Sequence, residues 1–170
     1  FISENGFREE RSWKQLRLNT SKLLKFFKDI KLNKGDRVAA YMPNCIETAE
    51  AFVATSSIGG IWSSCSPDFG ISGVVERFSQ IKPKVLFISD QYFYNGKKIN
   101  VINRLPKILK LIPSIKNIVI VNYPGKKSIK RKYKFKRQNL FKWSDLIKQT
   151  SNEIKFNQYD FESELAILYS

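Results

Sequence analysis

The 170-residue sequence contains no histidine, and this absence excludes several kinds of site. Ser-His-Asp and Cys-His catalytic arrangements need an imidazole, and so do zinc sites with histidine ligands. The two cysteines, Cys45 and Cys65, are too few for a zinc ribbon or a disulfide framework. With no histidine to activate them, we expect both to be small buried hydrophobic residues. Histidine-dependent catalysis is therefore excluded within this sequence, and thiol catalysis is not expected.

Long hydrophobic runs are also missing. The smoothest apolar stretch, 49–62, is interrupted by Thr55 and two serines, whereas a membrane-spanning helix needs about 20 apolar residues. No charged-then-apolar leader precedes Phe1, so we expect no secretory signal and a cytoplasmic location. Because the sequence starts at Phe1 and stops at Ser170, we expect a fragment of a longer chain. The 42% content of hydrophobic residues is that of a globular domain.

Acidic residues are absent from one window, 91–144, between Asp90 and Asp145. The whole sequence has 30 lysines and arginines against 15 aspartates and glutamates, a net charge of +15. The window holds fifteen of the basic residues, so the rest of the chain is neutral overall. Such a field attracts nucleic acid, anionic lipid or phosphorylated cofactors, although AT-rich coding also enriches lysine on solvated surfaces.

Basic and aromatic residues alternate at 130–137, as they do in proteins that bind single-stranded nucleic acid. The segment is short and isolated. It leaves one alternative function open, namely a basic module that binds nucleic acid or acidic lipid.

Strands and helices are predicted to alternate along the chain. Short apolar runs bounded by turn residues predict buried strands at 37–42, 61–65, 84–89, 117–121 and 165–169. Helical spacing of apolar residues predicts helices at 12–33, 46–58, 74–81, 99–111 and 143–150. The fourth of these helices contains Pro106, which is expected to bend it. The alternation predicts an α/β fold with a parallel sheet and right-handed crossovers.

Four segments are expected within this single α/β unit. They are an N-terminal hairpin and helix at 1–36, an α/β core at 37–122, a basic excursion at 123–142 and a return to the sheet at 143–170.

Two loops follow predicted strands, at the edge where open α/β sheets usually bind ligands. Neither loop contains a Gly-x-Gly-x-x-Gly or a Walker-type motif. In the first, 62–70, Ser66 and the amides near 69–72 could receive an anion, but its residues are also ordinary turn and cap residues. In the second, 90–98, Lys97 and Lys98 are expected at the start of the next helix. There they oppose the helix dipole unless a phosphate binds, or they are simply solvated.

A family resemblance includes both loops. The segments 34–39 (Lys-Gly-Asp-Arg-Val-Ala) and 41–44 (Tyr-Met-Pro-Asn) are similar to the N-terminal region of the AMP-forming acyl-CoA synthetases. The string at 62–70, Trp-Ser-Ser-Cys-Ser-Pro-Asp-Phe-Gly, resembles the branch of that family that activates acetoacetate. The segments 80–87 and 94–97 suit the same branch. The resemblance covers nearly the whole chain and is weakest at 126–139.

The resemblance implies a two-step ligase. A carboxylate attacks the α-phosphate of ATP, which gives an acyl-adenylate and pyrophosphate, and the thiol of coenzyme A then displaces AMP. Mg²⁺ would hold the triphosphate. An acetyl-, propionyl- or other short-chain acyl-CoA synthetase is the alternative within the same family.

The resemblance also implies that this chain is the N-terminal part of the large domain and is inactive alone. The ATP phosphate loop of the family begins directly after a Leu-Tyr-Ser such as 168–170, so Ser170 marks the edge of that loop. No catalytic or metal-binding residue is expected within the chain.

Coenzyme A is the one ligand whose contacts are expected here. In related enzymes the two matching loops contact the adenosine 3′-phosphate end of the cofactor. The resemblance assigns these contacts to Ser66, Pro67, Asp68, Tyr94, Asn95, Gly96 and Lys97. Lys97 is expected to be the phosphate-binding cation. Relatives usually have arginine at the positions of Lys97 and Tyr94, and a tyrosine cannot supply that charge.

Overall fold

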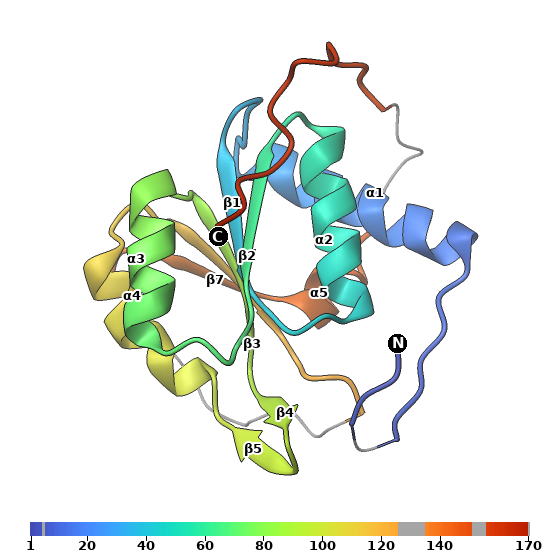
Figure 1. The fold of residues 1–170 in the computed structure, drawn as a ribbon. Helices are drawn as coiled ribbons and strands as arrows, with labels where there is room; N and C mark the ends of the chain where they lie inside the picture. Colours follow the sequence, from blue (N-terminus) through green and yellow to red (C-terminus); the bar gives the residue numbers. More distant parts are fainter. Residues whose placement is uncertain (5, 126–134, 151–155, 170) are drawn as a thin grey trace.

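A five-stranded parallel sheet lies between two layers of helices (Figure 1). The computed structural model describes residues 1–4, 6–125, 135–150 and 156–169. The strands of the sheet are β1 (Arg37–Tyr41), β2 (Ile61–Cys65), β3 (Val85–Ser89), β6 (Asn117–Val121) and β7 (Asn139–Lys142). Their order is β2-β1-β3-β6-β7, and all neighbours are parallel. The predicted fold class is confirmed.

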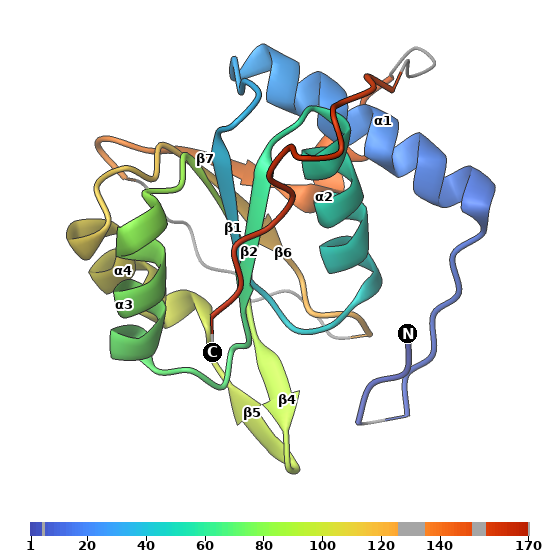
Figure 2. The same ribbon diagram turned by 45° about the horizontal axis from the view of Figure 1, so that its top comes forward.

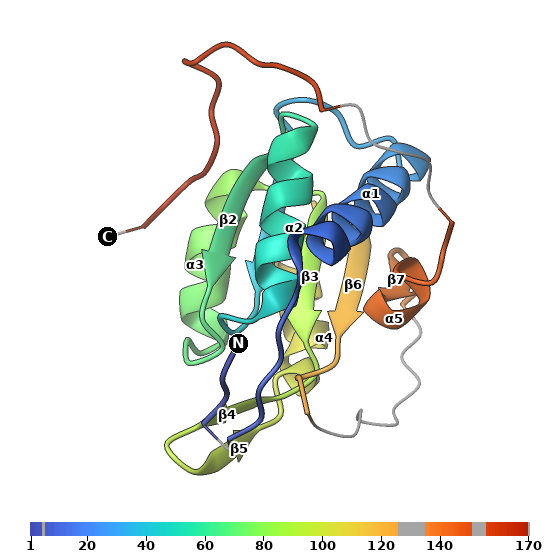
Figure 3. The same ribbon diagram turned by 90° about the vertical axis from the view of Figure 1, so that its right-hand side faces the viewer.

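The helices divide between the two faces of the sheet (Figures 1 and 3). One face is covered by α1 (Trp13–Asp29), α2 (Ile46–Ser57) and α5 (Trp143–Leu146), and the other by α3 (Ile71–Ile81), the 3₁₀ turn η1 (Ile102–Arg104) and α4 (Leu105–Leu111). Successive strand residues point to opposite faces, so Val38 and Ala40 pack under α1 and α2 while Ala39 and Tyr41 pack under α3 and α4. Burial on both faces explains why the inner strands β1, β3 and β6 are mostly apolar runs without alternation.

Phe87 on β3 lies at the centre of the core under α1, α2 and α5. Its ring meets Phe27 and Trp143 edge-on, each at 6.2 Å between centroids, and lies 6.5 Å from Trp62. The four aromatic side chains come from two helices and two strands, so they join one helical layer to the sheet. Aromatic contacts of this kind add to the free energy of area burial.

The segment 90–111 differs from its prediction. The expected helix over 99–111 is replaced by a hairpin of β4 (Tyr92–Tyr94) and β5 (Lys97–Ile99), followed by η1 and α4. Asn95 and Gly96 have φ of 49° and 68°, the left-handed conformation that a two-residue hairpin turn needs. Pro106 lies in the first turn of α4, where a proline is tolerated, so it begins a helix and does not bend one.

The expected buried strand at 165–169 is also wrong. A single parallel bridge, Trp62 to Ala166, joins this segment to the outer edge of β2. The Trp62 amide donates to the Leu165 carbonyl at 3.0 Å, and the Ile167 amide donates to the Trp62 carbonyl at 2.8 Å. Leu165 and Leu168 are 53% and 84% exposed. At the sheet's outer edge, an apolar run is not covered on both faces.

At the other edge, β7 was not predicted. It is only partly buried and its sequence is half polar, so it lacks the apolar run that marks the inner strands. β7 forms the last part of the expected basic excursion, 123–142, and residues 126–134 of that excursion lie outside the described residues. The structure therefore does not test the basic-aromatic pattern at Lys132, Tyr133 and Lys134.

The N-terminal hairpin is present as a single antiparallel bridge between Ile2 and Arg8. The Ser3 amide donates to the Phe7 carbonyl at 2.9 Å. Ser12 caps α1 by accepting from the Gln15 amide at 3.2 Å. Among the described residues, no helix combines the length and the apolar composition needed to cross a membrane.

Candidate functional site

The strand order places a topological switch point between β1 and β3. The chain leaves β1 toward α2 on one face, whereas it leaves β3 toward α4 on the other. Ligands of open α/β sheets bind outside the carboxyl ends of the strands at such a point. The loop after β2 and the β4–β5 hairpin after β3 both emerge at this edge, where the hairpin projects beyond the sheet (Figure 2). The structure thus brings the two predicted loops to one edge.

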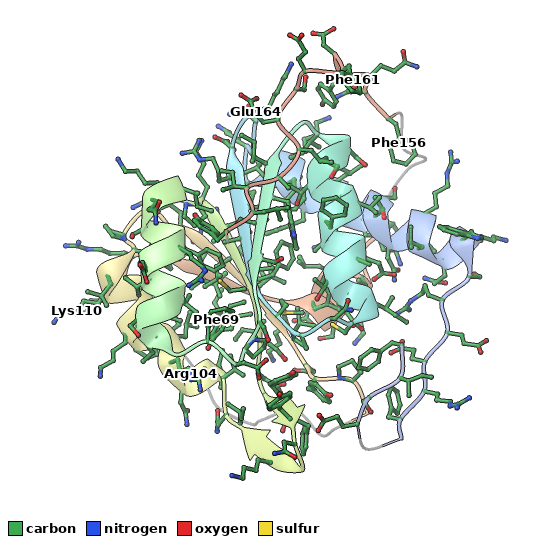
Figure 4. The ribbon with its side chains drawn as sticks, viewed as in Figure 1. Phe69, Arg104, Lys110, Phe156, Phe161 and Glu164 are labelled. Atoms are coloured by element: carbon green, nitrogen blue, oxygen red, sulfur yellow. The ribbon has the colours of Figure 1, made fainter. Side chains whose placement is uncertain are left out.

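Tyr41 and Arg104 hold residues 66–70, the part of the first loop that follows β2, against the sheet. Tyr41 ends β1 and is fully buried, and its hydroxyl lies 3.3 Å from the Pro67 carbonyl and donates to that of Phe69 at 2.5 Å. One terminal nitrogen of Arg104 donates to the same two carbonyls at 2.9 Å each and also to the Tyr41 hydroxyl. Figure 4 shows Arg104 beside Phe69 at this edge. These bonds fix the path of the loop backbone.

The pKa of the Tyr41 hydroxyl supports this role. Burial raises the pKa above its ordinary value, while the hydrogen bond and the charge of Arg104 oppose the shift. The phenol therefore stays protonated and donates at neutral pH. Sequence reasoning missed Arg104 because it was one of many basic residues in a predicted helix, and only the fold places it opposite two loop carbonyls.

The polar atoms of the first loop are tied to one another. Ser66 Oγ donates to Asp68 Oδ2 at 2.7 Å, and the Phe69 amide donates to the Ser66 carbonyl at 3.1 Å. The Arg77 guanidinium lies 4.4 Å from the centre of the Phe69 ring. Pro67 is buried whereas Asp68 is exposed. A carboxylate repels phosphate, so Asp68 is suited to accept hydrogen bonds from hydroxyl or amino groups of a ligand.

The hairpin after β3 corrects the expected position of the lysines. Lys97 pairs with Tyr94 across the hairpin, and Lys98 pairs with Phe93. The two lysines therefore point to opposite faces of a strand, and neither begins a helix. Neither lysine opposes a helix dipole, so the dipole gives no reason to expect a bound phosphate at this position. Lys97 and Lys98 are both exposed.

Aromatic rings line one face of the same hairpin. Tyr92 and Tyr94 stack with 6.1 Å between ring centres and 14° between planes, and Tyr94 is 52% exposed. Burial and the nearby Asp68 carboxylate raise the pKa of Tyr92, while a hydrogen bond to Ser66 lowers it. Tyr92 of the hairpin therefore lies near Ser66 and Asp68 of the first loop, and the exposed Tyr94 ring lies across the hairpin from Lys97.

The tip of the hairpin contacts the N-terminal segment. The Asn95 amide donates to Glu4 Oε1 at 3.1 Å, and the Gly96 amide donates to Glu4 Oε2 at 3.4 Å. One carboxylate thus accepts from two consecutive amides. No sequence pattern connects residues so far apart, so this contact was not predicted. Ser170, the last predicted site residue, lies outside the described residues.

A second group of titratable residues is buried between α1 and α2. Glu50 is fully buried, accepts from Asn19 Nδ2 at 2.9 Å and lies 3.3 Å from Arg11 Nε.

Both cysteines are buried, as expected, and burial raises the pKa of Cys45 to about 12, so its thiol stays protonated. Across the residues that the structure describes, no three His, Cys, Asp or Glu side chains are arranged to hold a metal ion.

The stability of the chain is expected to fall as the pH rises from about 4.5 to about 7. Burial raises the pKa of Glu50 from its ordinary value of 4.5 to about 7. The hydrogen bond from Asn19 and the charge of Arg11 lower this pKa but do not cancel the effect of burial. In that window the folded state keeps a proton that the unfolded state has released, so each step upward in pH favours unfolding. Urea unfolding across this pH range measures the slope.

Glu50→Gln should flatten that slope, because a glutamine does not titrate. Glu47 contributes to the slope that remains. Burial and the charge of Glu9 raise the pKa of Glu47, while Arg11 lowers it. A matched change at the exposed Glu76→Gln should leave the slope unchanged. An unaltered slope in Glu50→Gln would assign the pH dependence elsewhere.

The sequence also matches a known family over most of its length. Residues 2–160 match the family described as AMP-binding enzyme. The chain belongs to this family.

Several relatives carry one particular name. The chain is 36% identical to acetoacetyl-CoA synthetase of Xenopus tropicalis over 165 residues. This alignment covers 95% of the chain and 25% of that protein. It is 42% identical over 125 residues to acetoacetyl-coenzyme A synthetase of Rhizobium meliloti (strain 1021), with coverage of 74% and 19%. The solved structure of acetoacetyl-CoA synthetase from Streptomyces lividans superposes with a TM-score of 0.87 at 28% identity, over 99% of this chain and 25% of that one. The chain therefore spans about a quarter of the length of these relatives.

Proposed function

We propose that this chain acts as part of an ATP-dependent, AMP-forming acetoacetate–CoA ligase. The observation that carries the proposal is its similarity, over 95% of its length, to a protein named acetoacetyl-CoA synthetase. In this proposal the chain forms the N-terminal part of the large domain, and its switch-point edge binds coenzyme A. It makes no thioester alone, because it spans only a quarter of its relatives.

The described residues fit the nucleotide end of coenzyme A. Lys97 is an exposed cation, Tyr94 beside it offers an open ring on which a base can stack, and Ser66 lies in the neighbouring loop. Arginine is the usual phosphate ligand at such positions, but lysine binds phosphate as a point charge. Tyr94 then contributes stacking in place of charge.

ATP and Mg²⁺ would be held elsewhere. The described residues contain no cluster of carboxylates arranged for a metal ion. Ser170, expected at the edge of the phosphate loop, is not described. We assign the triphosphate and its metal to the part of the enzyme that this chain does not span, since the chain covers only a quarter of its relatives.

A direct assay tests the proposed activity. The full-length protein that carries this chain is supplied with acetoacetate, ATP-Mg²⁺ and coenzyme A, and thioester and AMP are measured. We expect acetoacetyl-CoA to form faster than acetyl-CoA or propionyl-CoA from the competing acids. Preference for acetate or propionate would assign the alternative ligase, and no thioester from any acid would reject the proposal.

Lys97→Glu in the full-length protein is expected to raise the KM for coenzyme A about tenfold and to leave the KM for ATP nearly unchanged. Reversing a charge next to a bound phosphate removes an attraction and adds a repulsion of similar size. Lys98→Glu is the matched control, since it makes the same charge change on the opposite face of the hairpin. Equal shifts for coenzyme A and ATP, or equal effects of the two variants, would contradict the assignment of Lys97.

A further inference from the structure

The hairpin tip holds two consecutive backbone amides that bind a carboxylate of the same chain. Asn95 and Gly96 are both left-handed, with φ of 49° and 68°, and each donates to a different oxygen of Glu4. Successive amides in turns form concave sites that favour anions. The structure therefore shows an anion-binding site and an internal anion within it.

We propose that Glu4 is an intramolecular competitor at this site and that the 3′-phosphate of coenzyme A replaces its carboxylate when the cofactor binds. The identity of the ligand rests on the proposed function. The existence of an anion site at the Asn95 and Gly96 amides does not, because it follows from the hydrogen bonds to Glu4.

The position of Glu4 suits an occupant that can leave. Its side chain is exposed, so moving into water costs little desolvation. Its backbone is tethered nearby, because the adjacent Ser3 is buried and bonded to Phe7, and Ile2 is bridged to Arg8. A tethered carboxylate acts at a high effective concentration and fills the site when no other anion is present.

The phosphate has the advantages needed to displace it. A phosphate monoester carries a charge of about −1.5 to −2 and three acceptor oxygens, compared with −1 and two oxygens for a carboxylate. Lys97 follows Gly96 directly and contributes a positive charge to the same turn. The same competition would disfavour dephospho-coenzyme A, which lacks the 3′-phosphate and cannot displace Glu4.

The effect of removing the competitor follows from this exchange. Glu4→Gln keeps the size of the side chain but loses its charge, so the amide pair is freer for phosphate. We expect the KM for coenzyme A to fall about fivefold, which corresponds to about 1 kcal/mol at 1.4 kcal/mol per tenfold change. The KM for dephospho-coenzyme A should stay unchanged.

Steady-state kinetics of the full-length protein test this prediction. Glu10→Gln is the matched control, because Glu10 is an exposed glutamate six residues further along, outside the hairpin turn, and it should change neither KM. If Glu4→Gln leaves the KM for coenzyme A unchanged or raises it, Glu4 is no competitor. If it shifts coenzyme A and dephospho-coenzyme A alike, Glu4 only supports the hairpin, and the inference is overturned.

A binding measurement separates this inference from the proposed function. Calorimetry on the full-length protein compares adenosine 3′,5′-bisphosphate with adenosine 5′-monophosphate, which lacks the 3′-phosphate. If Glu4→Gln binds the bisphosphate more tightly than the unaltered protein does and binds the monophosphate equally well, the competition is supported even if no thioester forms in the assay. Thioester formation with no gain for the bisphosphate in Glu4→Gln supports the proposed function and overturns the competition.

Discussion

Replacing Arg104 with leucine is expected to raise the KM for coenzyme A about tenfold in the full-length protein and to lower the free energy of unfolding of the chain by about 2 kcal/mol. Arg104 donates to the carbonyls of Pro67 and Phe69 and to the buried Tyr41 hydroxyl. Leucine leaves two carbonyls without their charged donor, so the loop loses its fixed path. Hydrogen bonds from charged donors contribute more than neutral ones, which sets the size of the effect.

Urea unfolding and the KM values for coenzyme A and ATP measure the two parts of this prediction. Arg104→Lys should give an intermediate effect, since lysine supplies a charge but not a rigid fork of donors. Lys107→Leu on the exposed side of α4 is the control for loss of a positive charge, and it should change both quantities little. If Arg104→Leu shifts stability but raises both KM values equally, Arg104 supports the fold without positioning the loop that we propose to bind coenzyme A.

Phe87→Ala should lower the free energy of unfolding by about 4 kcal/mol, the largest effect expected of any single substitution considered. The ring is 1% exposed and contacts Phe27, Trp62 and Trp143. Alanine loses this transfer free energy and leaves a cavity among side chains from both helices and strands, which cannot all relax into it. A loss of this size is comparable to the whole stability of a marginal domain.

Denaturant unfolding at 25 °C measures the loss, with Phe161→Ala as the matched control. Phe161 is fully exposed, so its truncation should change stability by less than about 0.5 kcal/mol. Figure 4 shows Phe161 in the outlying segment that follows α5. A loss of under about 1 kcal/mol in Phe87→Ala would show that this aromatic cluster does not hold the helical layer to the sheet.

The inner strands of the sheet were predictable because burial on both faces leaves a simple signal. β1, β3 and β6 are mostly apolar runs buried between neighbouring strands, and each was predicted within a residue or two of its bounds. The edge strand β2 was also predicted, although it contains two serines. The rest of the sheet edges gave no such signal. β7 is half polar, and the apolar 165–169 segment is exposed because it meets only the outer side of β2. An apolar run indicates burial only where neighbouring elements cover it, which sequence alone does not specify.

The candidate site was predictable in its loops but not in the contacts that hold them. Polar residues after β2 and β3 indicated that both loops lie at the carboxyl edge of the sheet, because parallel strands share their carboxyl ends. The error at Lys97 came from treating the Asn95-Gly96 turn as a helix approach when it closes a hairpin. Arg104 and Glu4 act through atoms distant in sequence, so only the fold identifies their partners.

The strand order has a consequence for how this chain folds during its synthesis. β2 and β3 both pair with β1, β6 pairs with β3, and β7 pairs with β6, so every strand of this sheet after β1 finds a neighbour that precedes it in the chain. As the polypeptide leaves the ribosome, each newly translated strand can dock at once on a partner that has already emerged. Folding can thus keep pace with translation, because no strand of this sheet after β1 has to wait for a later one before it can pair.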